Sequence, residues 1–260
     1  MTAADGPTPS FEYCVAGIRI ASPQRLSLPD AGFHDCHVTL HRADSESASR
    51  LLFPHLLDDL YGVQTALSGD GSQARIGTAF FDSPADEAAV IARQLAPFAA
   101  ALQGRLTLHA ACIVDGDRTM AFVGRSGIGK STLANSFGKL GAGVVSDDLL
   151  PIRSDARGCF LVPVASGAGM NPLNVLCFPE RVLPDAVPGV ERLSPFECMQ
   201  RLLLHGFGEL RHPPTWRMQF EAYGSLARRV PAYLVRIPDR LGRLAQTIEM
   251  LRKHPWEIQA

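Results

Sequence analysis

The sequence lacks the features that mark several specialised classes of protein. Its six cysteines include no C-x-x-C pair, so we interpret them as small buried hydrophobic residues in a reducing compartment. No apolar run reaches the about 18 residues that a membrane-spanning helix needs. Residues 1–10 contain no basic segment of the kind that begins a secretory signal. We therefore expect a soluble, cytoplasmic protein without a membrane partner.

An excess of charge of one sign is also absent. The formal net charge is -1, which argues against a nucleic-acid partner. Hydrophobic residues make up 46% of the chain and charged residues 20%, which excludes a disordered or fibrous protein. Lysine is scarce, since the basic residues are nearly all arginine and the lysines are Lys130, Lys139 and Lys253. A lysine inside a glycine-rich loop therefore needs its own explanation.

The length and the charge distribution predict two modules. A chain of 260 residues forms one large domain or two small ones. Acidic side chains concentrate in residues 1–103, whereas the rest of the chain is mildly basic, although random drift of surface charge would explain this equally well. We place a boundary near Gly104. The prediction is a smaller α+β region over 1–103, which would recognise a substrate or partner, and a catalytic domain over 104–260.

Hydrophobic periodicity predicts the main elements. In the first region we expect strands over 11–20 and 36–42, short strands on either side of the turn at 69–71, and a helix over 84–103 that Pro97 kinks. In the second region the expected strands are 105–114, 119–123, 143–148, 159–164 and 232–237. The expected helices there are the segment that begins near 131 and ends before Gly141, 195–205 and 239–254.

One glycine-rich segment points to a specific chemistry. Residues 124–131 read GRSGIGKS and match G-x-x-x-x-G-K-[ST], between a predicted strand and a predicted helix. Such a loop turns successive backbone N–H groups toward phosphate oxygens, and the following helix adds the positive end of its dipole. The alternative is a glycine-rich turn without a ligand. The residues predicted to bind the nucleotide are Gly124, Ser126, Gly127, Ile128, Gly129, Lys130, Ser131 and Thr132.

Three further side chains complete the predicted site. Asp147 and Asp148 follow a predicted strand one helix after the loop, and we expect them at the carboxyl end of a parallel strand. A carboxylate there can hold Mg²⁺, as can the Ser131 hydroxyl, while Lys130 would reach the β- and γ-phosphates. His109 would face the phosphates or the metal from the preceding strand. The alternatives are a solvated Asp-Asp turn and a core histidine.

The segments LHAACIV, VGRSGIGKSTLA and VVSDDLLPI, in this order, resemble the C-terminal catalytic domain of HPr kinase/phosphorylase. They are more distantly similar to phosphoenolpyruvate carboxykinase, which shares that nucleotide-binding fold. The resemblance covers residues 104–152. It implies an α/β P-loop nucleotide-binding core of this type, with ATP and Mg²⁺ as cofactors. It further implies His109 in the catalytic centre, Asp147 as general base toward an attacking hydroxyl and Asp148 as Mg²⁺ ligand, although the sequence itself leaves open which aspartate has which of the two roles.

The downstream part of that family pattern is absent. Residues 165–180 lack the Arg/Glu-containing signature that the family uses for phosphoryl exchange on HPr, so the resemblance does not extend to HPr as substrate, and the sequence leaves open whether phosphorylase activity exists. The layout is also similar to the HPr-kinase-like proteins of lasso-peptide biosynthesis, which phosphorylate a serine of a precursor peptide. The resulting prediction is a kinase that transfers the γ-phosphate of ATP to a Ser/Thr hydroxyl of a peptide or protein. A non-catalytic ATP-binding module and a simple NTPase are the alternatives, and oligomerisation stays open.

Two other clusters of side chains give weaker signals. His34 and Cys36 would lie on one face of a strand, with His37 and His41 on the other, which argues against a tetrahedral zinc site. A set of basic residues in the last third could line a groove for an acidic substrate, but solvated helix faces are the favoured interpretation. That set is Arg201, His205, Arg211, His212, Arg217, Arg228 and Arg229.

Overall fold

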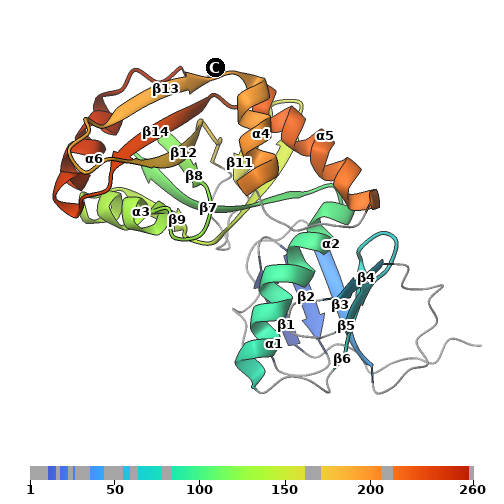
Figure 1. Cartoon of the computed structure of the whole chain (residues 1–260). Coiled ribbons are helices and arrows are strands. Elements are labelled where there is room, and N and C mark those ends of the chain that lie inside the picture. The colour runs from blue at the N-terminus through green and yellow to red at the C-terminus, as the bar shows by residue number, and fades with distance from the viewer. Residues whose placement is uncertain are drawn as a thin grey trace, which may run out of the picture. The chain divides into compact units, whose positions relative to one another are not determined.

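The computed structural model is a mixed α/β protein that divides into two compact units (Figure 1). It describes residues 11–15, 18–22, 26, 36–43, 55–58, 64–77, 83–161, 171–205 and 213–257. The first unit comprises Met1–Leu106, Val162–Gly169 and Gly208–Met218, and the second comprises Thr107–Leu161, Met170–Phe207 and Gln219–Ala260. Among the described residues, no helix is both long and apolar enough to cross a membrane.

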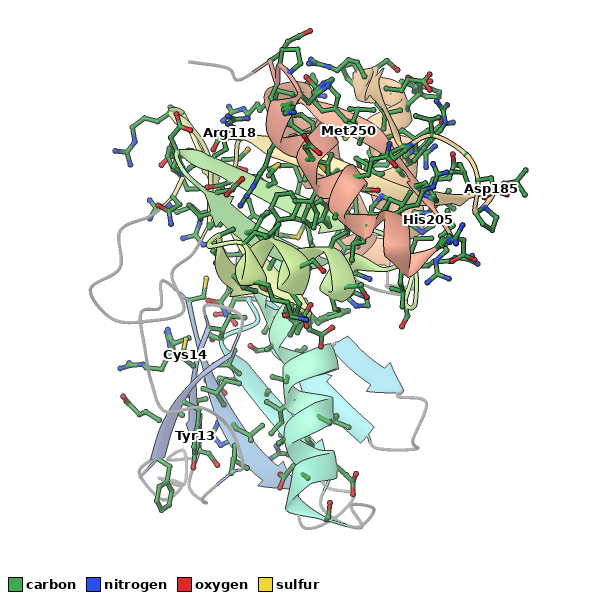
Figure 2. The ribbon with its side chains drawn as sticks, turned by 90° about the vertical axis from the view of Figure 1, so that its left-hand side faces the viewer. Tyr13, Cys14, Arg118, Asp185, His205 and Met250 are labelled. Atoms are coloured by element: carbon green, nitrogen blue, oxygen red, sulfur yellow. The ribbon has the colours of Figure 1, made fainter. Side chains whose placement is uncertain are left out.

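The first unit contains a six-stranded mixed sheet. In spatial order its strands are β1 (Phe11–Val15), β2 (Ile18–Ser22), β3 (Cys36–Ala43), β6 (Gln73–Gly77), β5 (Gln64–Leu67) and β4 (His55–Asp58). The expected single strand over 11–20 is wrong, because β1 and β2 pair antiparallel with Val15 opposite Ile18. The apolar alternation continues through both strands and so concealed the reversal. Tyr13, labelled in Figure 2, is buried, and its hydroxyl accepts the Leu26 N–H at 2.7 Å.

The predicted helix over 84–103 is confirmed as one continuous rod along this sheet (Figure 1). It consists of α1 (Pro84–Val90), a π-helical turn (Ile91–Leu95) and α2 (Ala96–Leu102). Pro97 falls in the first turn of α2, where the wider preceding turn accommodates a residue without an N–H. The rod's apolar face packs on the inward side chains of β2, β3 and β6 to form the core of this unit.

The turn between β5 and β6 approaches the helical rod closely. Ser68 and Ser72 donate hydrogen bonds to Asp70, and these bonds lower the pKa of its carboxyl group to about 2. Gly71 follows with φ +71°, and a Cβ atom there would lie 2.8 Å from Leu102 Cβ and 2.9 Å from the Ala99 carbonyl oxygen. Only glycine therefore fits at this contact.

We predict that Gly71→Ala destabilises the first unit by about 3 kcal/mol, because left-handed strain and a clash with backbone add up. Gly104→Ala is the matched control: its φ is +72°, but an added Cβ would meet nothing within 4 Å. The control should lower the free energy of unfolding by about 1 kcal/mol through backbone strain alone. Urea unfolding measures both, and equal losses in the two variants would contradict the predicted clash.

The second unit contains an eight-stranded sheet. The main strands in spatial order are β11 (Gly158–Leu161), β10 (Leu149–Asp155), β7 (Leu106–Asp115), β8 (Arg118–Val123), β12 (Val175–Val182), β14 (Ala232–Pro238) and β13 (Gly189–Leu193). The eighth strand, β9 (Gly143–Ser146), pairs with β7. The strands β8, β12 and β14 are parallel to one another, while β7 is antiparallel to both β8 and β9.

The described part of the second unit contains four α-helices, one of which begins in the first unit. They are α3 (Lys130–Lys139), α4 (Pro195–His205), α5 (Pro213–Arg229) and α6 (Leu244–Lys253), the last preceded by a 3₁₀ turn (Leu241–Arg243). The helices α3 and α6 pack side by side on one face (Figure 1), where Phe137, Leu251 and Phe122 belong to one apolar cluster. Most elements predicted for this half are confirmed, but β10, β12, β13 and α5 were not predicted. Of the expected strand 159–164, the residues after Leu161 lie outside the described residues.

Candidate functional site

The glycine-rich loop connects β8 to α3, as the motif predicts. Gly127 and Gly129 adopt φ +77° and +113°, conformations that L side chains rarely adopt. Ser126, Gly127, Ser131 and Thr132 are exposed, whereas Ile128 is buried. Gly129 forms the N-cap of α3, and no side chain in the described part of the protein caps that end of the helix. The first N–H groups of α3 are thus left to an acceptor outside the helix.

Lys130 is a buried cation within this loop. The residue is 5% exposed, and its Nζ donates hydrogen bonds to the carbonyl oxygens of Gly124 and Arg125 at 2.7 and 3.2 Å. Burial lowers the pKa of Lys130, and the negative charges of Asp148 and Asp147 oppose that shift. The ammonium group and both carboxylates therefore share one electrostatic environment.

The two aspartates form the bend between β9 and β10, and both are exposed. His109 Nε2 lies 3.1 Å from Asp148 Oδ1, so the structure brings the predicted histidine to the second carboxylate. The bend is held from both sides: the Ala110 N–H donates to the Asp148 carbonyl at 3.1 Å, and Ser146 Oγ donates to the Leu149 carbonyl at 2.6 Å. The position of Asp148 is thus fixed against β7 by main chain and side chain together.

The register of β7 explains why loop and carboxylates meet. Ala110 pairs with Val123, the last residue before the loop, and its own N–H binds the Asp148 carbonyl. Because β7 is antiparallel to β8 and β9, those two strands run in the same direction and end at the same edge of the sheet. We expected the aspartates to follow a strand that pairs in parallel. That expectation is wrong, because β9 pairs antiparallel with β7, although β9 runs in the same direction as β8.

Motif reasoning missed one contact to the loop. Arg181, near the end of β12, donates to the Gly127 carbonyl at 2.8 Å and to the Ile128 carbonyl at 3.4 Å. Its guanidinium also forms an ion pair with Asp239 at 3.1 Å. A single arginine in an arginine-rich chain gives no sequence signal, and β12 itself was not predicted.

One member of the basic set in the last third, His205, lies near the loop. Burial lowers the pKa of His205, and the charges of Arg201, Arg125 and Lys130 lower it further. His205 ends α4 (labelled in Figure 2), so the last turn of this helix is within electrostatic reach of the loop. Arg211 and His212 of this set lie outside the described residues, as does His34 of the histidine and cysteine cluster around β3. Within that cluster Cys36 is buried and His37 exposed, on opposite faces of β3.

Comparisons with known proteins add little. No family model and no curated protein matches the chain. Among solved structures, the chain is similar to the Hpr(Ser) kinase/phosphatase from Coxiella burnetii, with 14% identity and a TM-score of 0.34. The match covers 57% of this chain and 89% of that chain. A functional assignment therefore depends on the site residues themselves.

Proposed function

We propose that the protein is an ATP- and Mg²⁺-dependent kinase, with a nucleotide-binding core of the HPr kinase type, that phosphorylates a Ser/Thr hydroxyl of a peptide or protein. The observation that supports this most strongly is the position of Asp147 and Asp148. They lie at the sheet edge where the glycine-rich loop begins, within electrostatic reach of Lys130. Nucleotide phosphates in the loop would then have a carboxylate pair beside their terminal phosphoryl group.

The loop would bind the phosphates through its backbone. Residues 124–132 supply N–H groups at the start of α3, and the helix dipole favours the negative charge. Lys130 would exchange its bonds to the Gly124 and Arg125 carbonyls for bonds to the β- and γ-phosphate oxygens. This electrostatic positioning is most of the catalysis in phosphoryl transfer.

The polar side chains at the site fit Mg²⁺. Asp148 and Ser131 present exposed oxygen donors, which this hard cation prefers, and would hold it together with phosphate oxygens. The described residues contain no group of three His, Cys, Asp or Glu side chains that could enclose a metal. Such a cage is not needed, because Mg²⁺ in kinases relies on one or two carboxylates and on the substrate. When bound, Mg²⁺ would neutralise charge on the transferring phosphoryl group.

Asp147 is the proposed general base. The acceptor hydroxyl oxygen attacks the γ-phosphorus, the bond to the β,γ-bridging oxygen breaks, and the hydroxyl proton passes to the Asp147 carboxylate. ADP and a phosphoserine or phosphothreonine leave. His109, in its neutral form, would donate its Nε2 proton to Asp148 Oδ1, so that the carboxylate keeps a single orientation toward the metal.

The acceptor class is tested by following the γ-phosphate. The protein is incubated with Mg²⁺ and γ-labelled ATP in the presence of a library of peptides that each carry one Ser or Thr, with the matched Ala peptides as controls. We expect label on a subset of the hydroxyl peptides and none on the Ala peptides. Label that appears only as free phosphate would identify an NTPase, and label that stays in ATP would identify a binding module. Either outcome would overturn the kinase proposal.

A further inference from the structure

The helix α4 turns an apolar face outward. Phe196, Leu203 and Leu204 are 71%, 42% and 75% exposed, and spacings of seven and eight residues place them on one side of the helix. The opposite side carries Cys198 and Leu202, which are fully buried. Single exposed apolar side chains are normal on a protein surface, but a contiguous group marks a site of interaction. The outer face of α4 is therefore a candidate docking surface.

The one acidic residue of α4 belongs to its N-terminal cap. The Ser194 N–H and hydroxyl donate hydrogen bonds to the Glu197 carboxylate at 2.8 and 2.7 Å, and the Glu197 N–H donates to Ser194 Oγ at 3.3 Å. The bonds from Ser194 lower the pKa of Glu197, and the charge of Arg201 lowers it further. The negative charge is thus held at the start of the helix, and the rest of α4 carries no carboxylate.

The sheet topology brings the end of α4 to the glycine-rich loop. The strand β13 is antiparallel to β14, with Leu193 opposite Ala232, so β13 ends at the sheet edge away from the loop. The helix α4 begins one residue later and packs against β13 and β14 (Figure 1). Its 11 residues span about 16 Å, which is enough to return along the strands to the loop edge. His205, its last residue, accordingly senses the charge of Lys130.

The end of α4 near the loop is basic. Arg201 and His205 are half-buried and one helical turn apart, and Arg125 is exposed in the loop itself. Both arginine charges act on His205, so the three side chains share one region. Positive charge beside an apolar face is complementary to a peptide with acidic and apolar side chains. Lys130 serves the nucleotide in the proposed function, which leaves Arg201 to a carboxylate of the partner.

We propose that the outer face of α4 docks the acceptor peptide, and that this peptide carries apolar side chains and an acidic residue beside its Ser or Thr. The inference rests on the proposed function, since it assumes that a peptide hydroxyl accepts the phosphate. Apolar side chains of the peptide would cover Phe196, Leu203 and Leu204, and its carboxylate would pair with Arg201. Such contacts are the same before and during phosphoryl transfer, so they set KM and leave kcat unchanged.

The test uses four synthetic peptides of equal length that each contain one Ser. They combine Leu or Asn flanking residues with a single Asp or Lys, and each is supplied with the flank on either side of the Ser. Initial rates with the full chain and γ-labelled Mg-ATP give KM and kcat. Calorimetry with Mg-ADP and the thermal midpoint by circular dichroism report nucleotide binding and folding. The wild type should have its lowest KM for the peptide with Leu and Asp.

A double variant tests the apolar contacts. Phe196→Ser with Leu204→Ser removes the two most exposed apolar side chains of the face. It should raise KM for the Leu peptides about tenfold, with kcat and ADP affinity unchanged. The matched control is Leu183→Ser with Val187→Ser, at residues between β12 and β13 that are 78% and 73% exposed. The control should keep the KM of the wild type.

A charge reversal tests the acidic preference. Arg201→Glu should reverse the order of the Asp and Lys peptides, because the helix would then attract a cation. Arg157→Glu, in the exposed turn between β10 and β11, makes the same change of charge and should keep the order of the wild type. The preference for Asp should also weaken as the salt concentration rises.

Three results would count against the docking surface. Equal KM values of the wild type for all four peptides, or preferences that neither folded variant changes, would refute it and leave the kinase proposal intact. If sedimentation shows that Phe196→Ser with Leu204→Ser converts a dimer to a monomer, a second copy of the chain covers the face instead. If no peptide is labelled at all, the proposed function fails and the docking surface fails with it.

Discussion

Replacing Lys130 with methionine should reduce phosphoryl transfer by about 1,000-fold, the size of effect seen when one preorganised donor to a developing charge is lost. The residue is 5% exposed and its ammonium group lies near both carboxylates, so this group acts in a site of reduced dielectric. Methionine keeps the unbranched stem and therefore leaves the packing nearly intact. Initial rates with γ-labelled ATP and a peptide acceptor measure the loss.

Lys139→Met is the matched control for this substitution. Lys139 occupies the last turn of the same helix and is exposed, so its replacement changes the net charge of α3 equally without touching the loop. Transfer by this variant should stay within twofold of the wild type. If Lys130→Met retains more than about a tenth of the activity in the folded protein, the ammonium group has no part in stabilising the transferred group.

Replacing Asp147 with asparagine should lower turnover by about 100- to 10,000-fold, the range that a positioned general base contributes. Asparagine preserves the size of the side chain but cannot accept the hydroxyl proton. Nucleotide affinity should change little, because the loop supplies most of the phosphate contacts. Single-turnover transfer and calorimetry with Mg-ADP separate these two effects.

Two further variants test which aspartate is the general base and which binds Mg²⁺. Asp117→Asn, in the exposed turn between β7 and β8, removes an equal charge at a side chain that is 91% exposed and should leave turnover unchanged. Asp148→Asn should raise the Mg²⁺ concentration needed for half-maximal rate. If Asp147→Asn instead weakens nucleotide binding while turnover per bound complex stays normal, the base is not Asp147, and Asp148, held by His109, takes that role.

Local sequence predicted the elements around the loop because their signals are short-range. The strand before it, the glycines within it and the helix after it follow from propensity and motif alone. The sequence did not predict β12, and the reason lies in the tertiary structure. Pro179 lies within this central strand, and a proline in the middle of a segment normally argues against a central strand. The pairing of β12 with β8 ends at Cys177, so beyond that point the proline leaves no unmet bond to β8.

The helix α5 was missed for a similar reason. Its sequence begins with two prolines and contains Gly224, which favour turns when they are considered without context. At the first turn of a helix, however, a proline lacks only an N–H that would have no partner there. Tyr223, Leu226 and Ala227 are buried, so tertiary packing rather than intrinsic propensity stabilises this helix.

The residues of the candidate site also divide into those that the sequence predicted and those that only the fold brings together. His109, Lys130 and the two aspartates were predicted because motif order ties each of them to the loop. Arg181 and Asp239 belong to no motif, since an ion pair between residues 58 positions apart depends on how β12 and β14 pair. No local pattern in the sequence carries that information.

The sequence by itself determined the conformation of the loop. Gly127 and Gly129 permit the left-handed backbone that the bend between β8 and α3 requires, and Lys130 and Ser131 follow wherever that bend occurs. Only the tertiary structure decided that His109 meets Asp148 beside this loop. The reason is that β7 runs antiparallel between β8 and β9, so hydrogen bonding through Ala110 brings the ends of two distant strands to a single edge of the sheet.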